Sequence, residues 1–291
     1  MGHDHSHTGN QRRLQIALVI TALFTIVEAV GGLVTRSLAL LADAGHMLTD
    51  SMALALAVFA FAISARPADR KRSFGYHRFQ VLAAFVNGIT LIAIVAWILI
   101  EAVRRLFDPP TVLGDTMLVI AVAGLVVNVI AFWILHGGDQ DNLNMRGAAL
   151  HVLSDLLGSV AAIAAAIVII NTGWMPIDAI LSVVVAALIF RSAWYVVRHS
   201  AHILLEGAPE WLDVADIRSR LAAELPEVHD VHHVHVWGLT QQKLMLTMHL
   251  VLDSNAPDPT ATIRDVKRIL AEDYGIEHST IEIETHECAD E

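Results

Sequence analysis

Residues 79–100 read FQVLAAFVNGITLIAIVAWILI, a run of 22 residues without a charged side chain. As an α-helix this run extends about 33 Å, enough to cross the roughly 30 Å hydrocarbon layer of a membrane. Five further stretches have the same character, so the sequence predicts an α-helical membrane bundle of six transmembrane helices. The predicted spans are Leu14–Val34, Leu38–Ser64, Phe79–Ile100, Val112–Leu135, Met145–Ile170 and Pro176–Val197.

The composition of the whole chain also indicates a membrane protein. Of 291 residues, 55% are hydrophobic and only 17% are charged, and the mean hydropathy is +0.55. Soluble domains hold about 25% charged residues. The net charge of −11 comes from acids gathered after residue 205, and no basic patch suggests nucleic-acid binding. A single cysteine, Cys288, excludes an intrachain disulfide framework and favours a reducing compartment.

Lysine and arginine residues in the short loops predict how the bundle is oriented. The richer side holds Arg12, Arg13, Arg66, Arg70, Lys71, Arg72, Arg78, Arg146, Arg191 and Arg198, and the other side holds Arg36, Arg104 and Arg105. We therefore expect the richer side to face the cytoplasm. Six spans then place both termini there, in a multi-pass protein of the cell inner membrane.

The character of the chain changes after Glu206, so three parts are expected. Residues 1–13 form a polar leader with His3, His5 and His7, predicted to be disordered, which either gathers metal near the pore or has no effect. Residues 14–204 form the membrane domain. Residues 205–291 form a cytoplasmic metal-binding and dimerisation domain with helices at 211–225 and Pro259–Tyr274 and strands at Val228–Trp237, Lys243–Asp253 and 278–286. The order αββαβ implies an α+β domain with its helices on one face of a sheet.

Two of the predicted spans contain nearly the same heptapeptide: AGHMLTD at 44–50 and ALHVLSD at 149–155. In each, histidine and aspartate are four residues apart and therefore share one face of a helix. Ionisable groups at membrane depth are costly and usually functional. If the two helices face each other, His46, Asp50, His151 and Asp155 form a closed site of two nitrogens and two oxygens that suits Zn2+.

Several interpretations of these four residues compete. Each aspartate could pair with the histidine of its own turn and only hold helices together, or the site could hold a static structural zinc. A metal-gated channel and a membrane-bound metal sensor are alternative functions. An enzyme is disfavoured, because four protein ligands leave no open position for water and the sequence lacks an HExxH motif. Because metal requires neutral imidazole and ionised carboxylate, protons compete with it, and we predict an antiporter in which His46 and His151 carry the protons.

Other polar residues also lie in the predicted spans. Glu28, Asn87 and Asn128 could line a hydrated pathway, although polar residues also bind helices together, which is favoured for the asparagines. Glu101 is spaced to pair with Arg104 or Arg105 at the membrane edge.

Three motifs resemble the cation diffusion facilitator family, and within it the bacterial zinc exporters: SLALLADAGHMLTD at 37–50, SFGYHR at 73–78 and the heptapeptide at 149–155. The resemblance covers nearly the whole chain. It implies a homodimer, alternating access, proton-coupled efflux of Zn2+ and a ferredoxin-like C-terminal domain. Cd2+ and other divalent transition metals are further candidate substrates, and Zn2+ is also a candidate regulatory ligand.

The resemblance also suggests individual residues. Some relatives bind metal in the loop between spans two and three through an aspartate and two histidines. Here these positions are Asp69, Arg72 and Tyr76, so no such site is expected. Arg78 and Glu206 match a charge pair near the membrane surface where the dimer is held. The alternative is a basic anchor and a linker acid.

The tail is rich in histidine. On a regular strand, His229, His233 and His235 would share one face and His232 the other, so they cannot all bind one ion. The resemblance selects His232 and His249, with an acidic or histidine position on the last strand. Glu284 and His286 are the candidates for that position. Surface histidines without metal are the competing interpretation.

Overall fold

The structure is a computed structural model that describes all residues except 1–3, 65, 137–142, 253–257 and 285–291. For residues 4–14, 50, 53–55, 57–58, 61–62, 64, 136 and 143–154, it describes the helical backbone alone. The chain divides into two compact units, residues 1–56 with 86–196 and residues 57–85 with 197–291. Each unit is considered by itself.

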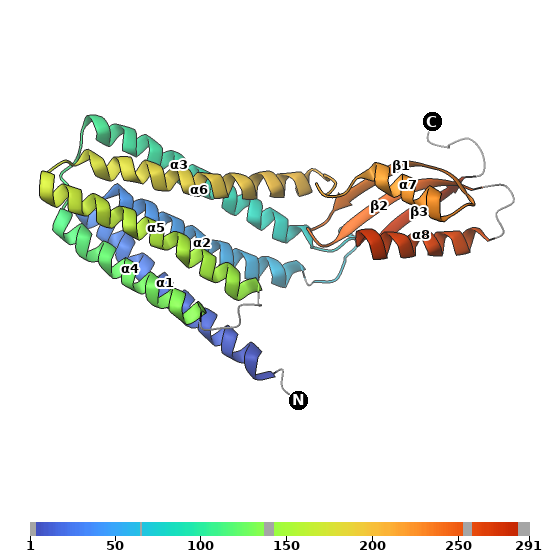
Figure 1. The fold of residues 1–291 in the computed structure, drawn as a ribbon, viewed down its shortest axis with the longest axis horizontal. Coiled ribbons are helices and arrows are strands. Elements are labelled where there is room, and N and C mark those ends of the chain that lie inside the picture. The colour runs from blue at the N-terminus through green and yellow to red at the C-terminus, as the bar shows by residue number, and fades with distance from the viewer. Residues whose placement is uncertain (1–3, 65, 137–142, 253–257, 285–291) are drawn as a thin grey trace. The chain divides into compact units, whose positions relative to one another are not determined.

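Long helices make up the first two thirds of the chain (Figure 1). They are α1 Asp4–Thr35, α2 Leu38–Ser64, α3 Arg78–Phe107, α4 Gly114–His136, α5 Leu143–Thr172 and α6 Pro176–Leu204. Within the described residues, five segments are long and apolar enough to cross a membrane: Gln15–Thr35, Arg78–Phe107, Gly114–Leu135, Asp155–Thr172 and Pro176–Leu204. In α2, the apolar stretch whose side chains are described without a gap is Leu38–Thr49, so the count of six spans stays a prediction.

The start of α1 differs from the expected disordered leader. The helix begins at Asp4, so residues 4–13 have helical backbone. Extending an existing helix adds one backbone hydrogen bond for each residue ordered, and residues 4–13 contain no proline to stop it. The polar leader therefore continues the first span.

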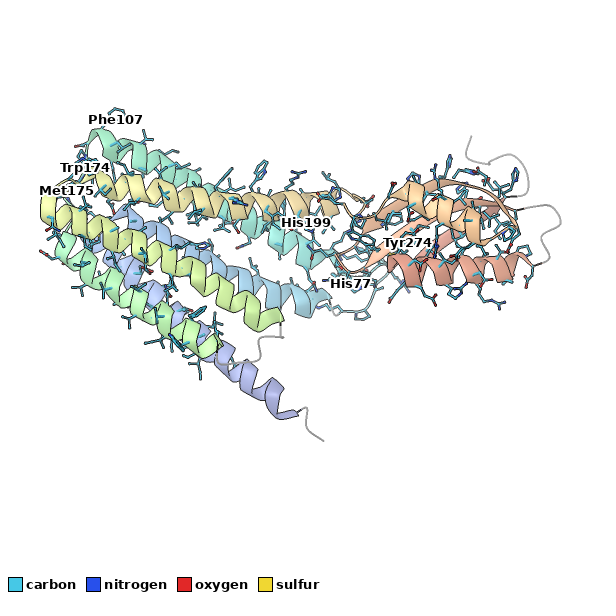
Figure 2. All side chains as sticks on the ribbon, in the orientation of Figure 1. His77, Phe107, Trp174, Met175, His199 and Tyr274 are labelled. Atoms are coloured by element: carbon cyan, nitrogen blue, oxygen red, sulfur yellow. The ribbon has the colours of Figure 1, made fainter. Side chains whose placement is uncertain are left out.

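Large apolar side chains cover the outer faces of these helices. Leu33 on α1 and Val119 and Trp133 on α4 are about 70% exposed. At one end of the bundle, Phe107 projects from the end of α3, and Trp174 and Met175 lie in the α5–α6 connection (Figure 2). Aromatic residues are enriched where a membrane meets water. This surface is that of a bundle surrounded by lipid.

Helix α2 lies between two apolar clusters in the first unit. Ala39 and Leu40 face one way and pack with α4 and α5, where small residues such as Ala162 and Ala166 allow helices to approach closely. Leu38 and Ala42 face another way and pack with α3 and α6. The first of these contacts places the histidine-containing part of α2 next to α5.

The tail domain follows α6, with α7 Val214–Glu224, β1 Val228–Gly238, β2 Leu244–Leu252, α8 Pro259–Tyr274 and β3 His278–Glu284. The element order is the predicted αββαβ. Asp213 caps α7 by accepting a hydrogen bond from the backbone N–H of Ala215, and Asp258 caps α8 in the same way. Gly275 ends α8 at φ +66°, a conformation that glycine adopts without strain.

In the described part of the tail, the sheet has the order β1-β2-β3 (Figure 1). Strands β1 and β2 are antiparallel, whereas β2 and β3 are parallel and are connected through α8. Apolar residues of α7, α8 and all three strands share one core, including Ile217, Leu221, Leu246, Leu250 and Ile269. The structure thus confirms an α+β domain with a small sheet, and the ferredoxin-like assignment stays a prediction.

Candidate metal centres

The helix-borne motifs bring one histidine and one aspartate together across 109 residues of sequence. His46 on α2 and Asp155 on α5 approach each other, with 4.0 Å between Nε2 and Oδ1. The side chain of Asp155 is 2% exposed and that of His46 is 17% exposed. Gly45 contributes to the packing of α2, because a Cβ there would already contact Ile94 of α3 at 3.5 Å.

Asp50 and His151 complete the predicted set of four. Asp50 lies one helical turn after His46 on α2, and His151 lies one turn before Asp155 on α5. Their side chains lie outside the described ones, so their part in the site stays a prediction.

Two more carboxylates are buried in the same unit. Glu28 on α1 is 1% exposed and Asp43 on α2 is 2% exposed. The sequence marked Glu28 as a pathway residue, whereas Asp43 stood only within a motif. Asp43 lies against Gly158 of α5, where any Cβ would overlap its carboxylate. The signal for such residues is an acidic side chain inside an apolar span.

The beginning of α2 is held by a residue that the sequence analysis did not single out. Asp178, at the start of α6, accepts hydrogen bonds from Ser37 Oγ at 2.7 Å, from Leu38 N at 2.6 Å and from Ala39 N at 3.2 Å. Arg105 Nη1 lies 3.7 Å from Asp178 Oδ2. Arg105 also binds Glu101 at 3.0 Å, as the spacing predicted. The helix that carries His46 is therefore anchored by α6 and α3.

A second cluster of candidate ligands lies in the tail domain. One ligand atom each from His232, His249 and Glu284 can be chosen so that all lie within 4.8 Å of one another. His249 Nδ1 is 2.8 Å from Glu284 Oε1, and His232 Nε2 is 3.1 Å from Glu284 Oε2. Two imidazoles and a buried carboxylate form a donor set that fits Zn2+. His286, Cys288 and His3 lie outside the described residues, as do the side chains of His5 and His7.

The alternation expected for β1 was wrong at His233. The pairing register of β1 and β2 shifts between His232 and His235, and His233 has φ +48°. This β-bulge places the His233 ring 4.9 Å from that of His249 and 5.3 Å from that of His232. His233 therefore lies near the candidate ligands instead of sharing a face with His235.

The loop before α3 is organised by hydrogen bonds. Asp69 accepts hydrogen bonds from the backbone N–H groups of Lys71 and Arg72 and from the hydroxyl of Tyr76, all at 2.7 Å. The hydrogen bond from Tyr76, followed by those from the backbone, lowers the pKa of Asp69. The Arg72 guanidinium lies 4.8 Å from the centre of the Tyr76 ring. Arg72 and Tyr76 thus bind Asp69 at the positions where some relatives have metal ligands.

Arg78 and Glu206 form an ion pair within the second unit. Arg78 Nη2 lies 3.0 Å from Glu206 Oε1. Nearby, His77, labelled in Figure 2, has its Nε2 atom 2.9 Å from Lys243 Nζ. Partial burial, and then the charge of Lys243, lower the pKa of His77.

Comparison with known proteins assigns both parts of the chain. Residues 14–205 match the family described as "Cation efflux transmembrane domain", and residues 209–286 match "Cation efflux protein, cytoplasmic domain". A protein named zinc transporter ZitB, from Pectobacterium atrosepticum, is 49% identical over 294 residues, covering 100% of this chain and 91% of its own. A Bacillus velezensis protein named "Cadmium, cobalt and zinc/H(+)-K(+) antiporter" is 43% identical over 291 residues, covering 98% and 92%.

Among solved structures, the metal-bound C-terminal domain of the CzcD transporter from Cupriavidus metallidurans is 33% identical with a TM-score of 0.24. The match covers 25% of this chain and 99% of that one.

The family matches and the apolar helices identify a multi-pass membrane transporter and not an enzyme. Its N-terminal part is the efflux domain and its C-terminal part is the cytoplasmic domain of such proteins. The chain therefore belongs to the cation diffusion facilitator family of cation efflux transporters.

Proposed function

We propose that this protein exports Zn2+ from the cytoplasm in exchange for protons, through a site of His46, Asp50, His151 and Asp155. The observation that carries this proposal is the approach of His46 and Asp155 from two different helices, with 4.0 Å between Nε2 and Oδ1. An ion between these two atoms would need only small side-chain movements, because Zn–N and Zn–O bonds are about 2.0–2.2 Å.

The same ligands explain the exchange. Zn2+ binds neutral imidazole and ionised carboxylate, so each bound metal ion displaces protons and each bound proton weakens metal binding. A site open to the cytoplasm would take Zn2+ and release protons. A site open to a more acidic medium would take protons and release Zn2+. Two similar relatives are named for zinc transport, and one of these names includes H(+)-K(+) antiport, which supports the substrate and the coupling. The match to a cation efflux domain supports the direction.

We further propose the arrangement around this site. The excess of basic residues in one set of loops supports cytoplasmic termini in the cell inner membrane. The domain limits are proposed as 1–13, 14–204 and 205–291, with six spans in the second part. Residues 209–286 match the cytoplasmic domain family named ZT_dimer, and this name supports a homodimer. The Arg78–Glu206 pair is proposed to lie where the two copies meet.

The tail cluster is proposed to hold a regulatory Zn2+. His232, His249 and Glu284 would be its ligands, and His286, which lies outside the described residues, would be the fourth. Burial of His249 and Glu284, at 8% and 7% exposure, is costly unless polar partners or a metal compensate it. Such an ion would join β1, β2 and β3, so the tail domain would be more rigid with Zn2+ bound than without it.

The decisive experiment measures Zn2+ flux into proteoliposomes under an imposed pH gradient. The native chain is compared with Asp50→Ala and Asp155→Ala, and with Asp115→Ala as a control for an exposed acid at the start of α4. Gradient-driven flux that both site substitutions abolish, with folded protein, supports the exporter. Flux that survives both substitutions excludes this site. Flux that ignores both a pH gradient and a K+ gradient would indicate a channel.

A further inference from the structure

Three buried oxygen atoms on three different helices accept no hydrogen bond from an N–H group or a hydroxyl group of the described residues: Glu28 Oε1 on α1, Asp43 Oδ2 on α2 and Asn128 Oδ1 on α4. Their residues are 1%, 2% and 1% exposed. In the described part of the chain, no salt bridge reaches either carboxylate. A buried acceptor without a donor destabilises the fold, and more so when it is charged. Three together in one bundle require a physical reason.

The three residues are linked through contacts among four helices. The Glu28 and Asp43 side chains contact each other directly. Asn128 Nδ2 lies 3.4 Å from Ser159 Oγ on α5. Ser159 follows Gly158, against which the Asp43 carboxylate packs. The contacts therefore run from α1 to α2, on to α5 and from there to α4.

Two glycines shape the same place. A Cβ on Gly158 would overlap Asp43, and a Cβ on Gly124 would lie 3.4 Å from Glu28 Oε1. Gly124 is one turn before Asn128, so both residues lie on the face of α4 that is turned to Glu28. Larger side chains at these two positions would fill the space that the carboxylates occupy. This arrangement of Glu28, Asp43 and Asn128, which we call the cradle, holds oxygen atoms and is not a gap in apolar packing.

The cradle is adjacent to the proposed metal site but separate from it. Asp43 lies three residues before His46, about one turn nearer the start of α2, and Ser159 lies one turn after Asp155, nearer the end of α5. At this end of the bundle Leu113 N binds Thr35 O at 3.1 Å, which ties the α3–α4 connection to the end of α1. By the proposed orientation, this is the side away from the cytoplasm.

We propose that Glu28, Asp43 and Asn128 form a second cation position that takes the counter-cation exchanged for the metal. The position presupposes the exporter proposed above. Its donors are all oxygen, which suits protons and hard cations such as K+, whereas the imidazoles of the neighbouring site suit Zn2+. The other titratable group that acts on both carboxylates is Asp155, which lies 4.0 Å from His46. A cation here therefore reduces the repulsion among Glu28, Asp43 and Asp155.

The test uses full-length protein in proteoliposomes and compares Glu28→Gln, Asp43→Asn and the control Asp115→Asn. Zn2+ flux is driven in separate experiments by a pH gradient at equal K+ and by a K+ gradient at equal pH. Zn2+ affinity is measured in detergent on the same substitutions in a His249→Ala background, so that the tail cluster does not contribute. Size-exclusion profiles and helical circular dichroism verify folding.

The expected result is a loss of about tenfold or more in gradient-driven flux for Glu28→Gln and Asp43→Asn, with Zn2+ affinity changed by less than about threefold. The gradient that drives the native chain identifies the counter-cation as the proton or K+. An equal loss of Zn2+ affinity would assign these residues to the metal site and overturn the second position. Retained coupling in both variants would also overturn it while leaving the exporter intact. A native chain that moves no Zn2+ would refute both.

Discussion

Asp178 at the start of α6 accepts a hydrogen bond of 2.6 Å from the backbone N–H of Leu38, which lies 140 residues earlier and begins α2. The first N–H groups of a helix have no partner within the helix, and a residue of the same segment usually caps them. Here the cap comes from another helix. The position of α2, and with it that of His46, therefore depends on α6.

Removing this carboxylate is expected to destabilise the bundle. Asp178→Ala leaves the N–H groups of Leu38 and Ala39 and the guanidinium of Arg105 without their shared acceptor. We expect a loss of about 3 kcal/mol or more, measured as reduced resistance to thermal unfolding in detergent. Asp115→Ala, which removes an exposed first-turn acid of α4, should cost less than about 1 kcal/mol. Equal effects of the two substitutions would contradict the anchoring role.

Much of the fold could be predicted because each element has a strong local signal. The spans have long apolar runs, and α8 has Asp258 before it and Gly275 after it. The spacing of His46 and Asp50 could also be interpreted, since residues four apart share a helix face. The meeting of His46 with Asp155 required one further assumption, that α2 packs on α5, which the near-identity of the two heptapeptides suggested.

The remaining features depend on contacts between elements distant in sequence. The bulge at His233 arises from how β1 pairs with β2, and an alternating pattern in β1 alone does not reveal it. The cap that Asp178 provides has no local signature at Leu38. The contact of Glu28 with Asp43 likewise joins two spans that each contain an ordinary-looking acid.

The loop at residues 66–77 should lose order when its central acceptor is removed. Asp69→Asn weakens the hydrogen bonds from Lys71, Arg72 and Tyr76. We expect trypsin to cut after Lys71 and Arg72 several-fold faster than in the native chain, because proteases attack locally opened segments. Asp108→Asn, in the α3–α4 connection, serves as the control. Unchanged cleavage would show that these bonds do not order the loop.

Acid should have the same effect on the native loop. The pKa of Asp69 is lowered, chiefly by the hydrogen bond from Tyr76, whereas in an unfolded chain it is about 3.9. The contribution of the ionised group to stability is therefore complete above about pH 4 and is lost as pH falls through the lower folded pKa. After correction for the intrinsic exchange rate at each pH, hydrogen exchange of residues 69–76 should rise over that interval in the native chain. In Asp69→Asn it should be high already at neutral pH.

Tyr274 should ionise only at unusually high pH. Its hydroxyl donates a hydrogen bond of 2.7 Å to Asp216 Oδ2, which connects α8 with α7 (Figure 2 labels Tyr274). Burial, followed by this hydrogen bond, raises the pKa of Tyr274 to about 12. The unfolded value is about 10, so the neutral phenol stabilises the tail fully below pH 10, and this contribution is lost as pH rises towards 12.

An ultraviolet absorbance titration can isolate this group, because the chain has only three tyrosines. Native protein should show a tyrosinate step near pH 12 that Tyr274→Phe lacks. Tyr195→Phe should retain that step. A step near pH 10 in place of the late one would mean that the contact with Asp216 does not hold the proton.

Glu206 forms an ion pair and has an unfavourable backbone conformation. Its φ is +62°, just after the end of α6, at a position where helices commonly have glycine. We expect Glu206→Gly to be more stable than Glu206→Ala by about 1 kcal/mol, since only glycine relieves the strain while both remove the charge. Arg78→Gln measures the exposed pair alone and should cost less than about 1 kcal/mol. Thermal unfolding of Gly and Ala variants at the same temperature would disprove the strain.

Zinc should stabilise the tail domain through its cluster, even when the membrane site is disabled. In an Asp155→Asn background, Zn2+ at about 100 times its dissociation constant should add about 2.7 kcal/mol to the stability of the tail, and EDTA should reverse the gain. Because His249 and Glu284 come from β2 and β3, His249→Ala and Glu284→Gln should each abolish the response. His235→Ala should keep it, since His235 is exposed on β1 beyond the bulge. If His235→Ala removes the response as fully as His249→Ala does, the metal is bound by surface histidines and the cluster is not the regulatory site.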